Sequence, residues 1–263
     1  MTPLRFLLLA VALAGSGAPA AASLTPDQLA SVGVRPPPDA ALPLDALLTD
    51  IDGHATTLAT TIAGRPAIVI FADYDCQQLC SPIIGLAGSA LKDSGLAPGL
   101  DYRLAIVGFN PDATAADARR MVEGQIGLDT AVGRVTSALI ASPSVAKLLT
   151  AAVGYHFVHD ADNHRYAHPA ALLVVTPDGR LSRVLSGLSI NGDDVRTALK
   201  GATHGGVVAI VDQIRSLCYG LGASVGRYAN PVRLMLAAAG TLTLLAVAGG
   251  IGFLVRASGE GRL

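Results

Sequence analysis

The chain has 263 residues and a formal net charge of −1, from 19 basic and 20 acidic side chains. Charged residues make up only 15% of the sequence, whereas soluble domains carry about 25%. So few basic residues exclude the positive surface that nucleic-acid binding requires, and a hydrophobic content of 51% excludes a disordered polyelectrolyte. The apolar excess lies mainly at the two ends of the chain.

The first 22 residues have the pattern of a secretory signal peptide. Arg5 precedes an apolar run at 6–14, and small residues follow up to Ala22. The run is too short to span a bilayer, and the small residues are typical of a cleavage site. We therefore expect export of the chain and removal of residues 1–22. Residues 23–43 are rich in alanine and proline and predict an extended linker.

A second apolar stretch lies near the C-terminus, at 234–255. Its 22 residues carry no charge, and as a helix they would extend about 33 Å, enough to cross the hydrocarbon core of a bilayer. Gly249 and Gly250 would be costly in a water-soluble helix but are common in membrane helices. We expect a single transmembrane helix here, preceded by a juxtamembrane segment at 204–233 and followed by a cytoplasmic tail at 256–263. The domain would then lie on the periplasmic side of the inner membrane, next to the lipid bilayer.

Between these ends, predicted strands and helices alternate. The continuous β-branched run at 67–71 is typical of a strand that is buried on both faces of a sheet. Asp52-Gly53 predicts the turn of a hairpin. The expected elements are a hairpin at 47–57, strands at 67–71, 102–109, 135–140, 170–176 and 181–185, and helices at 83–91, 113–123, 143–153 and 193–200. This order predicts an α/β domain at 44–203, with a mixed sheet and helices on both faces.

Two of the three cysteines, Cys76 and Cys80, form a C-x-x-x-C motif between the first buried strand and a helix start. Four positions apart on a helix, their Cβ atoms would lie about 5–6 Å apart, whereas a disulfide needs about 3.5–4.5 Å. A disulfide therefore requires Cys76 to lie in the loop, while two metal–sulfur bonds of about 2.3 Å tolerate the spacing more easily. The motif allows redox chemistry and favours a shared metal. A plain disulfide or two inert buried cysteines are the alternatives.

The charges around the motif also favour a metal. Asp73 and Asp75 precede the cysteines, and their negative charge disfavours the thiolate form that a reactive cysteine needs. The N-terminus of the following helix opposes this effect, and a bound cation would make both carboxylates favourable. Two soft thiolates select Cu(I) or zinc, and a nearby imidazole would complete either site.

Candidate imidazoles are concentrated in one segment, because four of the six histidines lie within thirteen positions, directly before the strand predicted at 170–176. Taken one at a time, each is typical of a solvated loop. The four are His156, His159, His164 and His168. The third cysteine, Cys218, lies in an amphipathic stretch before the apolar C-terminal run. We expect it to be a bystander thiol, with dimerisation or copper relay as the alternative.

Together, the strand, the C-x-x-x-C motif at a helix start, and a distant histidine before a strand and a Pro-Asp-Gly turn resemble the SCO/SenC family. Its members are membrane-tethered copper proteins with a thioredoxin fold that serve cytochrome c oxidase assembly. The resemblance covers about Leu44 to Lys200 and implies a thioredoxin-like fold. In that family the histidine ligand lies nine residues before the proline of the turn, and nine residues before Pro177 is His168. The segment at 212–219 also resembles a subgroup that is anchored at its C-terminus.

The resemblance implies a copper metallochaperone. Cys76, Cys80 and His168 would bind Cu(I), and Cu(II) with added ligands, for delivery to the copper-accepting subunit of a membrane respiratory oxidase. Other periplasmic copper carriers and thioredoxin-like reductants are further implied partners. The alternative is an enzyme, a thiol–disulfide oxidoreductase whose redox pair, Cys76 and Cys80, reduces the cysteines of the oxidase copper site.

Two positions depart from the family pattern. Gln77 follows the first cysteine, where members often have proline. Asn110-Pro111-Asp112 stands where an Asp-Pro pair is common, so an acidic role there would pass to Asp112. Neither departure removes a predicted copper ligand, and both bear more on partner docking than on copper binding.

Overall fold

The computed structural model describes residues 24–76, 80–162, 164–203 and 229–259. Residues Ser23–Gly220 form one compact unit, and the two ends of the chain are assigned to a second unit. The predicted signal peptide, most of the predicted juxtamembrane segment, and Cys218 lie outside the described residues. The side chain of Cys80 also lies outside the description, although its backbone is included.

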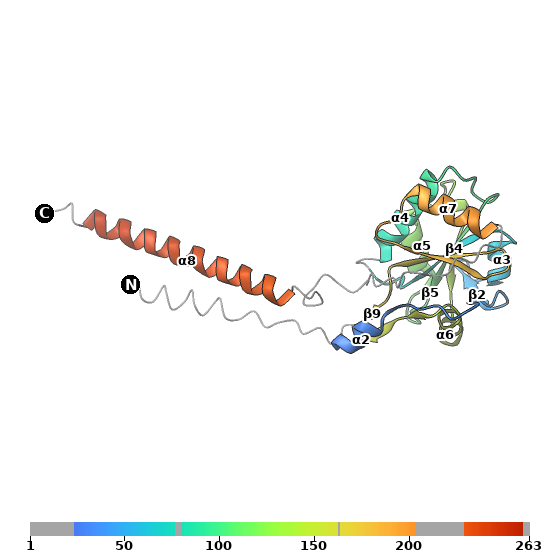
Figure 1. Cartoon of the computed structure of the whole chain (residues 1–263), viewed down its shortest axis with the longest axis horizontal. Helices are drawn as coiled ribbons and strands as arrows, with labels where there is room; N and C mark the ends of the chain where they lie inside the picture. The colour runs from blue at the N-terminus through green and yellow to red at the C-terminus, as the bar shows by residue number, and fades with distance from the viewer. Residues whose placement is uncertain (1–23, 77–79, 163, 204–228, 260–263) are drawn as a thin grey trace. The chain divides into compact units, whose positions relative to one another are not determined.

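The domain is built on a seven-stranded mixed sheet (Figure 1). Its strands are β2 (Leu47–Asp50), β3 (Ala55–Thr57), β4 (Ala67–Ala72), β5 (Arg103–Gly108), β6 (Thr136–Ile140), β10 (Ala171–Val175) and β11 (Leu181–Ser186). They lie in the order β11-β10-β4-β5-β6-β2-β3. The three central strands, β4, β5 and β6, are parallel, and the strands on either side of them are antiparallel to their neighbours. This mixed sheet confirms the predicted α/β class.

Helices cover both faces of the sheet. They are α3 (Leu58–Ile62), α4 (Cys80–Asp93), α5 (Ala115–Gln125), α6 (Pro143–Ala152) and α7 (Gly192–Thr203). Successive side chains of a strand point to opposite faces, so Ile68 and Ile70 of β4 pack in the core under α4, α5 and α7. Val69 and Phe71 pack in the other core, with α3 and α6. Both faces of β4 are therefore buried, as its continuous apolar sequence predicts.

Local sequence signals define where several helices begin. Thr114 caps α5 in a capping box, in which its hydroxyl accepts from the backbone of Asp117 and the Asp117 carboxylate accepts from the backbone of Thr114. Ser142 caps α6, and Pro143 occupies the first helical position, where its missing N–H costs no hydrogen bond. The predicted helices at 113–123 and 143–153 are thus confirmed within a few residues.

The segment at 23–43 contains more structure than its alanine- and proline-rich composition predicts. It forms helix α2 (Pro26–Ser31), followed by strand β1 (Gly33–Val34), which pairs with β7 (Tyr155–His156). Thr25 and Gln28 form a capping box that starts α2, and Leu29 is buried. A short hairpin of β8 (Val158–Asp160) and β9 (Arg165–Ala167) follows β7. The extended-linker prediction gave too little weight to the buried leucine and valine side chains in this segment.

Helix α8 (Ala229–Gly259) belongs to the second unit and is described by itself. It contains the apolar stretch at 234–255 for which the sequence predicts a membrane span. Within the part of the chain that the structure describes, no helix has both the length and the apolar character that crossing a membrane requires.

Candidate metal centre

Three loops lie at one edge of the sheet. Because β4 and β5 are parallel, their ends lie side by side, with Ala72 paired to Gly108. Strand β10 runs antiparallel to β4, so the residues that precede β10 lie at the same edge. The loop after β4 contains Cys76, and His168 stands three residues before β10. The topology therefore places the first cysteine and the predicted histidine ligand at the same edge of the sheet.

The loop after β4 is held by backbone and side-chain contacts. The Cys76 N–H donates to the backbone oxygen of Asp73 at 3.1 Å, which forms a tight turn, and the Cys76 side chain is half-buried. Two residues earlier, the buried hydroxyl of Tyr74 donates to the Ile106 carbonyl at 2.7 Å and accepts from the Leu139 N–H at 3.2 Å. Burial raises the pKa of Tyr74, so the hydroxyl stays protonated and keeps this anchor.

The two cysteines of the motif have different backbone settings. Cys76 lies in the loop, off the helix, and Cys80 is the first residue of α4. This backbone arrangement meets the condition that a disulfide requires, and it is equally compatible with two thiolates on one metal. The cysteines themselves therefore leave both chemistries open.

Asp73 points into the protein, where it forms a buried polar pair with Asn110. The Asn110 amide donates to Asp73 Oδ1 at 2.8 Å, and the Asp75 N–H donates to the same oxygen at 3.1 Å. Burial raises the pKa of Asp73, while these hydrogen bonds oppose the shift. The side-chain Oδ1 of Asn110 accepts from the Asp112 N–H at 3.0 Å. Asn110 therefore connects the loops that follow β4 and β5, and the carboxylate of this pair comes from Asp73.

His168 is buried, with only 2% of its surface exposed. Its Nδ1 lies 3.0 Å from the Tyr155 hydroxyl and 3.2 Å from the Pro169 carbonyl oxygen. Its ring packs edge-on against Phe109, at a centroid separation of 5.4 Å. Together with Ile83, in the first turn of α4, it lines a small cavity of about 10 Å³. The histidine therefore lies beside the helix that begins at Cys80.

Burial lowers the pKa of His168 from 6.5 to about 4, and the contact with the Pro169 carbonyl opposes the shift only in part. The imidazole is consequently neutral at neutral pH. A neutral imidazole has one nitrogen lone pair, which is the form that binds a metal ion. His168 is therefore in the protonation state that a metal ligand requires.

We expect the unfolding free energy of the metal-free protein to fall by about 2 kcal/mol between pH 7 and pH 5 because of His168. In the unfolded chain its pKa is near the ordinary 6.5, so it takes up a proton over this range, whereas the folded pKa of about 4 keeps it neutral. This contribution is complete above pH 6.5 and is lost as the pH falls toward 4. Urea denaturation of the wild type and of His168→Asn at both pH values measures it.

The raised pKa of Asp73 acts in the opposite direction, because protonation of a buried carboxyl stabilises the folded state at low pH. Asp73 is present in both proteins, so the difference between them isolates His168. An equal loss of stability in the wild type and the variant would contradict the assignment.

The other three histidines of the segment are exposed. His159 stacks on Tyr166 with ring centroids 4.5 Å apart, and His164 has a left-handed backbone with φ of 48°. His156 lies on β7, next to Tyr155, with its side chain exposed. His168 is therefore distinguished from the other three by its burial. Its contact with Tyr155 joins residues 13 positions apart, and no spacing pattern in the sequence indicates it.

A different acidic group lies at the turn between β2 and β3. Among the described residues, Asp50, Asp52 and His54 bring one ligand atom each within 4.8 Å of one another. Asp52 also pairs with Arg119 at 2.5 Å, and Asp50 accepts from the backbone of residues 52 and 54. These contacts account for the group as a hairpin turn.

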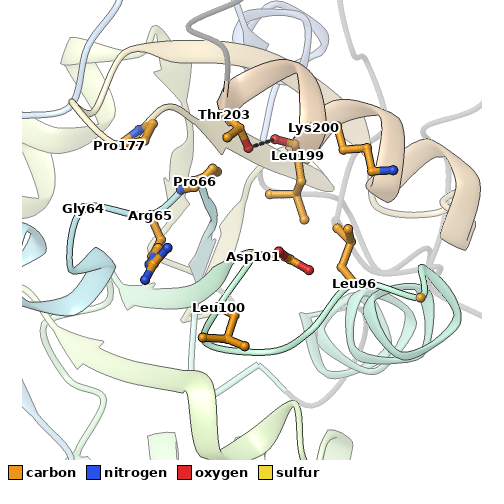
Figure 2. Close-up of a pocket in the computed structure, with 11 residues that line it drawn as sticks. Gly64, Arg65, Pro66, Leu96, Leu100, Asp101, Pro177, Leu199, Lys200 and Thr203 are labelled. Carbon is orange, nitrogen blue, oxygen red and sulfur yellow. Dashed lines mark hydrogen bonds between the residues drawn. The ribbon is translucent and has the colours of Figure 1, made fainter.

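A cavity of about 670 Å³ lies at the opposite edge of the sheet (Figure 2). Its lining includes Pro66, directly before β4, and Pro177, soon after β10. The six residues of β4 separate it from the cysteine loop by about 20 Å. This cavity is therefore distinct from the candidate metal centre.

The fold resembles solved structures, although no protein-family model matches the chain and no curated protein does. One similar structure is a protein of Aquifex aeolicus VF5, provisionally described as an electron transfer protein. It is 23% identical, with a TM-score of 0.56, and the match covers 63% of this chain and 94% of that one. Another is Arabidopsis thaliana ScoI with copper bound, at 14% identity and a TM-score of 0.50, covering 61% and 96%. The domain thus has the same fold as a Sco protein. The motifs in its sequence resemble those of the same family.

Proposed function

We propose that the chain is a copper chaperone that binds Cu(I) through Cys76, Cys80 and His168. The observation that carries this proposal is a buried, neutral histidine at the sheet edge where the Cys76 loop begins, beside the first turn of the helix that starts at Cys80. Thiolate and imidazole are soft to intermediate ligands, which favour Cu(I). The fold shared with a Sco protein solved with copper bound supports the same function.

Burial of His168 suits a site that must both hold and release copper. A histidine whose pKa is about 4 keeps its lone pair in mildly acidic conditions. At the imidazole nitrogen, copper therefore does not compete with a proton under those conditions. Transfer would proceed by ligand exchange, in which soft ligands of the acceptor replace neutral His168 first and then one thiolate. The acceptor that we propose is the copper-binding subunit of a membrane respiratory oxidase. Cu(II) would bind with added ligands.

We also propose that the domain is exported and held at the membrane. The signal-like segment at 1–22 and the uncharged stretch at 234–255 support this location. The domain would then face the periplasm, with its tail at 256–263 in the cytoplasm. Protease added to intact spheroplasts tests this topology, since it would reach the domain but not the tail.

Anaerobic titration of the full chain with Cu(I) should give one copper per monomer. The double variant Cys76→Ser, Cys80→Ser should lose this stoichiometric binding, because two of the three ligands are then hydroxyls, which are hard ligands. Cys218→Ser is the matched control: it removes the one cysteine outside the motif and should still bind one copper. Stoichiometric binding by the double variant would exclude the proposed site.

A thiol–disulfide oxidoreductase is the second candidate. The position of Cys76 off the helix permits it, because only a loop residue can approach the first residue of α4 closely enough for a disulfide. The thiolate of the reduced pair would attack a disulfide of the oxidase subunit, form a mixed disulfide, and release the subunit's second thiol. Resolution by the other cysteine would then leave the pair oxidised and the subunit reduced. His168 has no role in this chemistry.

A further inference from the structure

Tyr155 lies directly behind His168, in strand β7. Its hydroxyl oxygen lies 3.0 Å from His168 Nδ1 and 2.9 Å from the Pro169 carbonyl oxygen. The Phe71 carbonyl oxygen, at the end of β4, is 3.5 Å away. Only 2% of the Tyr155 surface is exposed, so water does not compete for these contacts. The hydroxyl thus connects the backbone of the predicted metal site to one nitrogen of its histidine.

One arrangement of hydrogens satisfies all three polar atoms. The hydroxyl of Tyr155 carries one hydrogen, and a neutral imidazole carries one N–H. If Nδ1–H donates to the hydroxyl oxygen and the hydroxyl donates to the Pro169 carbonyl, each contact joins a donor to an acceptor. If Nδ1 carries no hydrogen, the Pro169 carbonyl faces a lone pair at 3.2 Å, and the single hydroxyl hydrogen must be shared among three acceptors, Nδ1 and the carbonyls of Pro169 and Phe71. The contacts therefore favour hydrogen on Nδ1, which places the lone pair on Nε2.

The N-terminal segment fixes Tyr155 in this position. Val34 of β1 is paired with Tyr155, and the Arg35 N–H donates to the Gly154 carbonyl at 2.8 Å. The ring of Tyr155 also packs against Phe71, at a centroid separation of 4.9 Å. A hydroxyl held by both a strand pairing and a core ring has little freedom to turn away from His168. The segment at 24–35 therefore supports the candidate metal centre from behind.

We propose that Tyr155 is a positioning residue, which holds His168 with hydrogen on Nδ1 so that Nε2 is the copper ligand. The copper part of this inference rests on the proposed function, whereas the position of the hydrogen is a property of the metal-free protein. Hydrogen bonds to the distal nitrogen of a ligating histidine fix its ring orientation and raise its basicity. Removing such a partner lowers metal affinity by about 10–100-fold.

The first measurement uses the wild-type full chain in detergent, without metal and with ¹⁵N-labelled histidine. The chain has six histidines, so the His168 ring nitrogens can be assigned with a His168→Asn reference. Long-range ¹H–¹⁵N spectra at pH 7 should show His168 protonated on Nδ1. A hydrogen on Nε2 would overturn the inference, whatever the protein does with copper.

The second measurement compares Tyr155→Phe with Tyr102→Phe. Tyr102 is also fully buried, and its hydroxyl has no hydrogen-bond partner among the described residues, so its loss tests the removal of a buried hydroxyl away from the site. Tyr155→Phe should populate both tautomers of His168 and bind Cu(I) about 10–100-fold more weakly, while Tyr102→Phe should match the wild type in both respects.

The outcomes separate the two proposals. A single Nδ1–H tautomer and unchanged copper affinity in Tyr155→Phe would overturn the positioning role while leaving the copper function standing. If the wild type binds no copper, the proposed function fails, and the tautomer spectra of the metal-free proteins still decide the role of Tyr155. X-ray absorption of the copper-loaded wild type provides an independent check, since it should show one nitrogen neighbour besides the sulfurs.

Discussion

Replacing His168 with alanine should lower the Cu(I) affinity by at least about a hundredfold, while thiol–disulfide exchange by Cys76 and Cys80 continues. The loss should exceed the 10–100-fold effect of removing a partner of a ligand, because here a ligand itself is removed. Competition with a Cu(I) chelator measures the affinity, and reaction with a small disulfide measures the exchange. This pair of measurements distinguishes a chaperone from an oxidoreductase, since only the chaperone needs the histidine.

Two further variants make the result interpretable. His168→Asn places an amide N–H near the position of Nδ1, so it can still donate to the Tyr155 hydroxyl while Nε2 is absent, and it should lose copper as the alanine variant does. His156→Ala removes an exposed histidine of the same segment and should bind copper like the wild type. Wild-type affinity in both His168 variants would show that His168 is not a ligand.

Replacing Gly154 with alanine should lower the unfolding free energy by at least about 3 kcal/mol. Gly154 has φ of 62°, and a Cβ atom there would overlap the Arg35 carbonyl and lie 2.9 Å from Cα of Pro36. All of these are backbone atoms, so relief of the overlap requires β1 and β7 to move apart. Because Tyr155 follows directly, the same movement should weaken copper binding. Chemical denaturation of the metal-free variant and Cu(I) competition measure the two effects.

Gly64→Ala is the control for backbone conformation. Gly64 has almost the same φ, 65°, but a Cβ atom there would meet nothing within 4 Å. Its replacement should therefore cost only about 1 kcal/mol, the penalty of a left-handed alanine. Equal destabilisation by the two variants would show that the close approach of β1 to β7 contributes nothing beyond the backbone conformation.

The sequence predicts the central elements well because their signals are local. The continuous run at 67–71 requires burial on both faces, and the structure places it as β4, at the centre of the sheet. Ser142-Pro143 predicts a helix start, and α6 begins there. The sequence does not predict the short helix α3 or the two-residue strands β1 and β7. Elements as short as these have no periodicity to detect. These strands are formed by their pairing with each other.

For the candidate metal centre, the sequence by itself determined the chemical types and the order of the residues: a C-x-x-x-C motif after a buried strand and a histidine before a later one. Only the tertiary structure decided which histidine is buried, because burial depends on what packs around it. His156 and His168 belong to the same histidine-rich segment, yet antiparallel pairing of β10 with β4 brings only His168 to the buried edge beside Phe71 and Tyr155. The resulting loss of hydration keeps His168 neutral, and that property depends on contacts between distant segments, which sequence spacing does not encode.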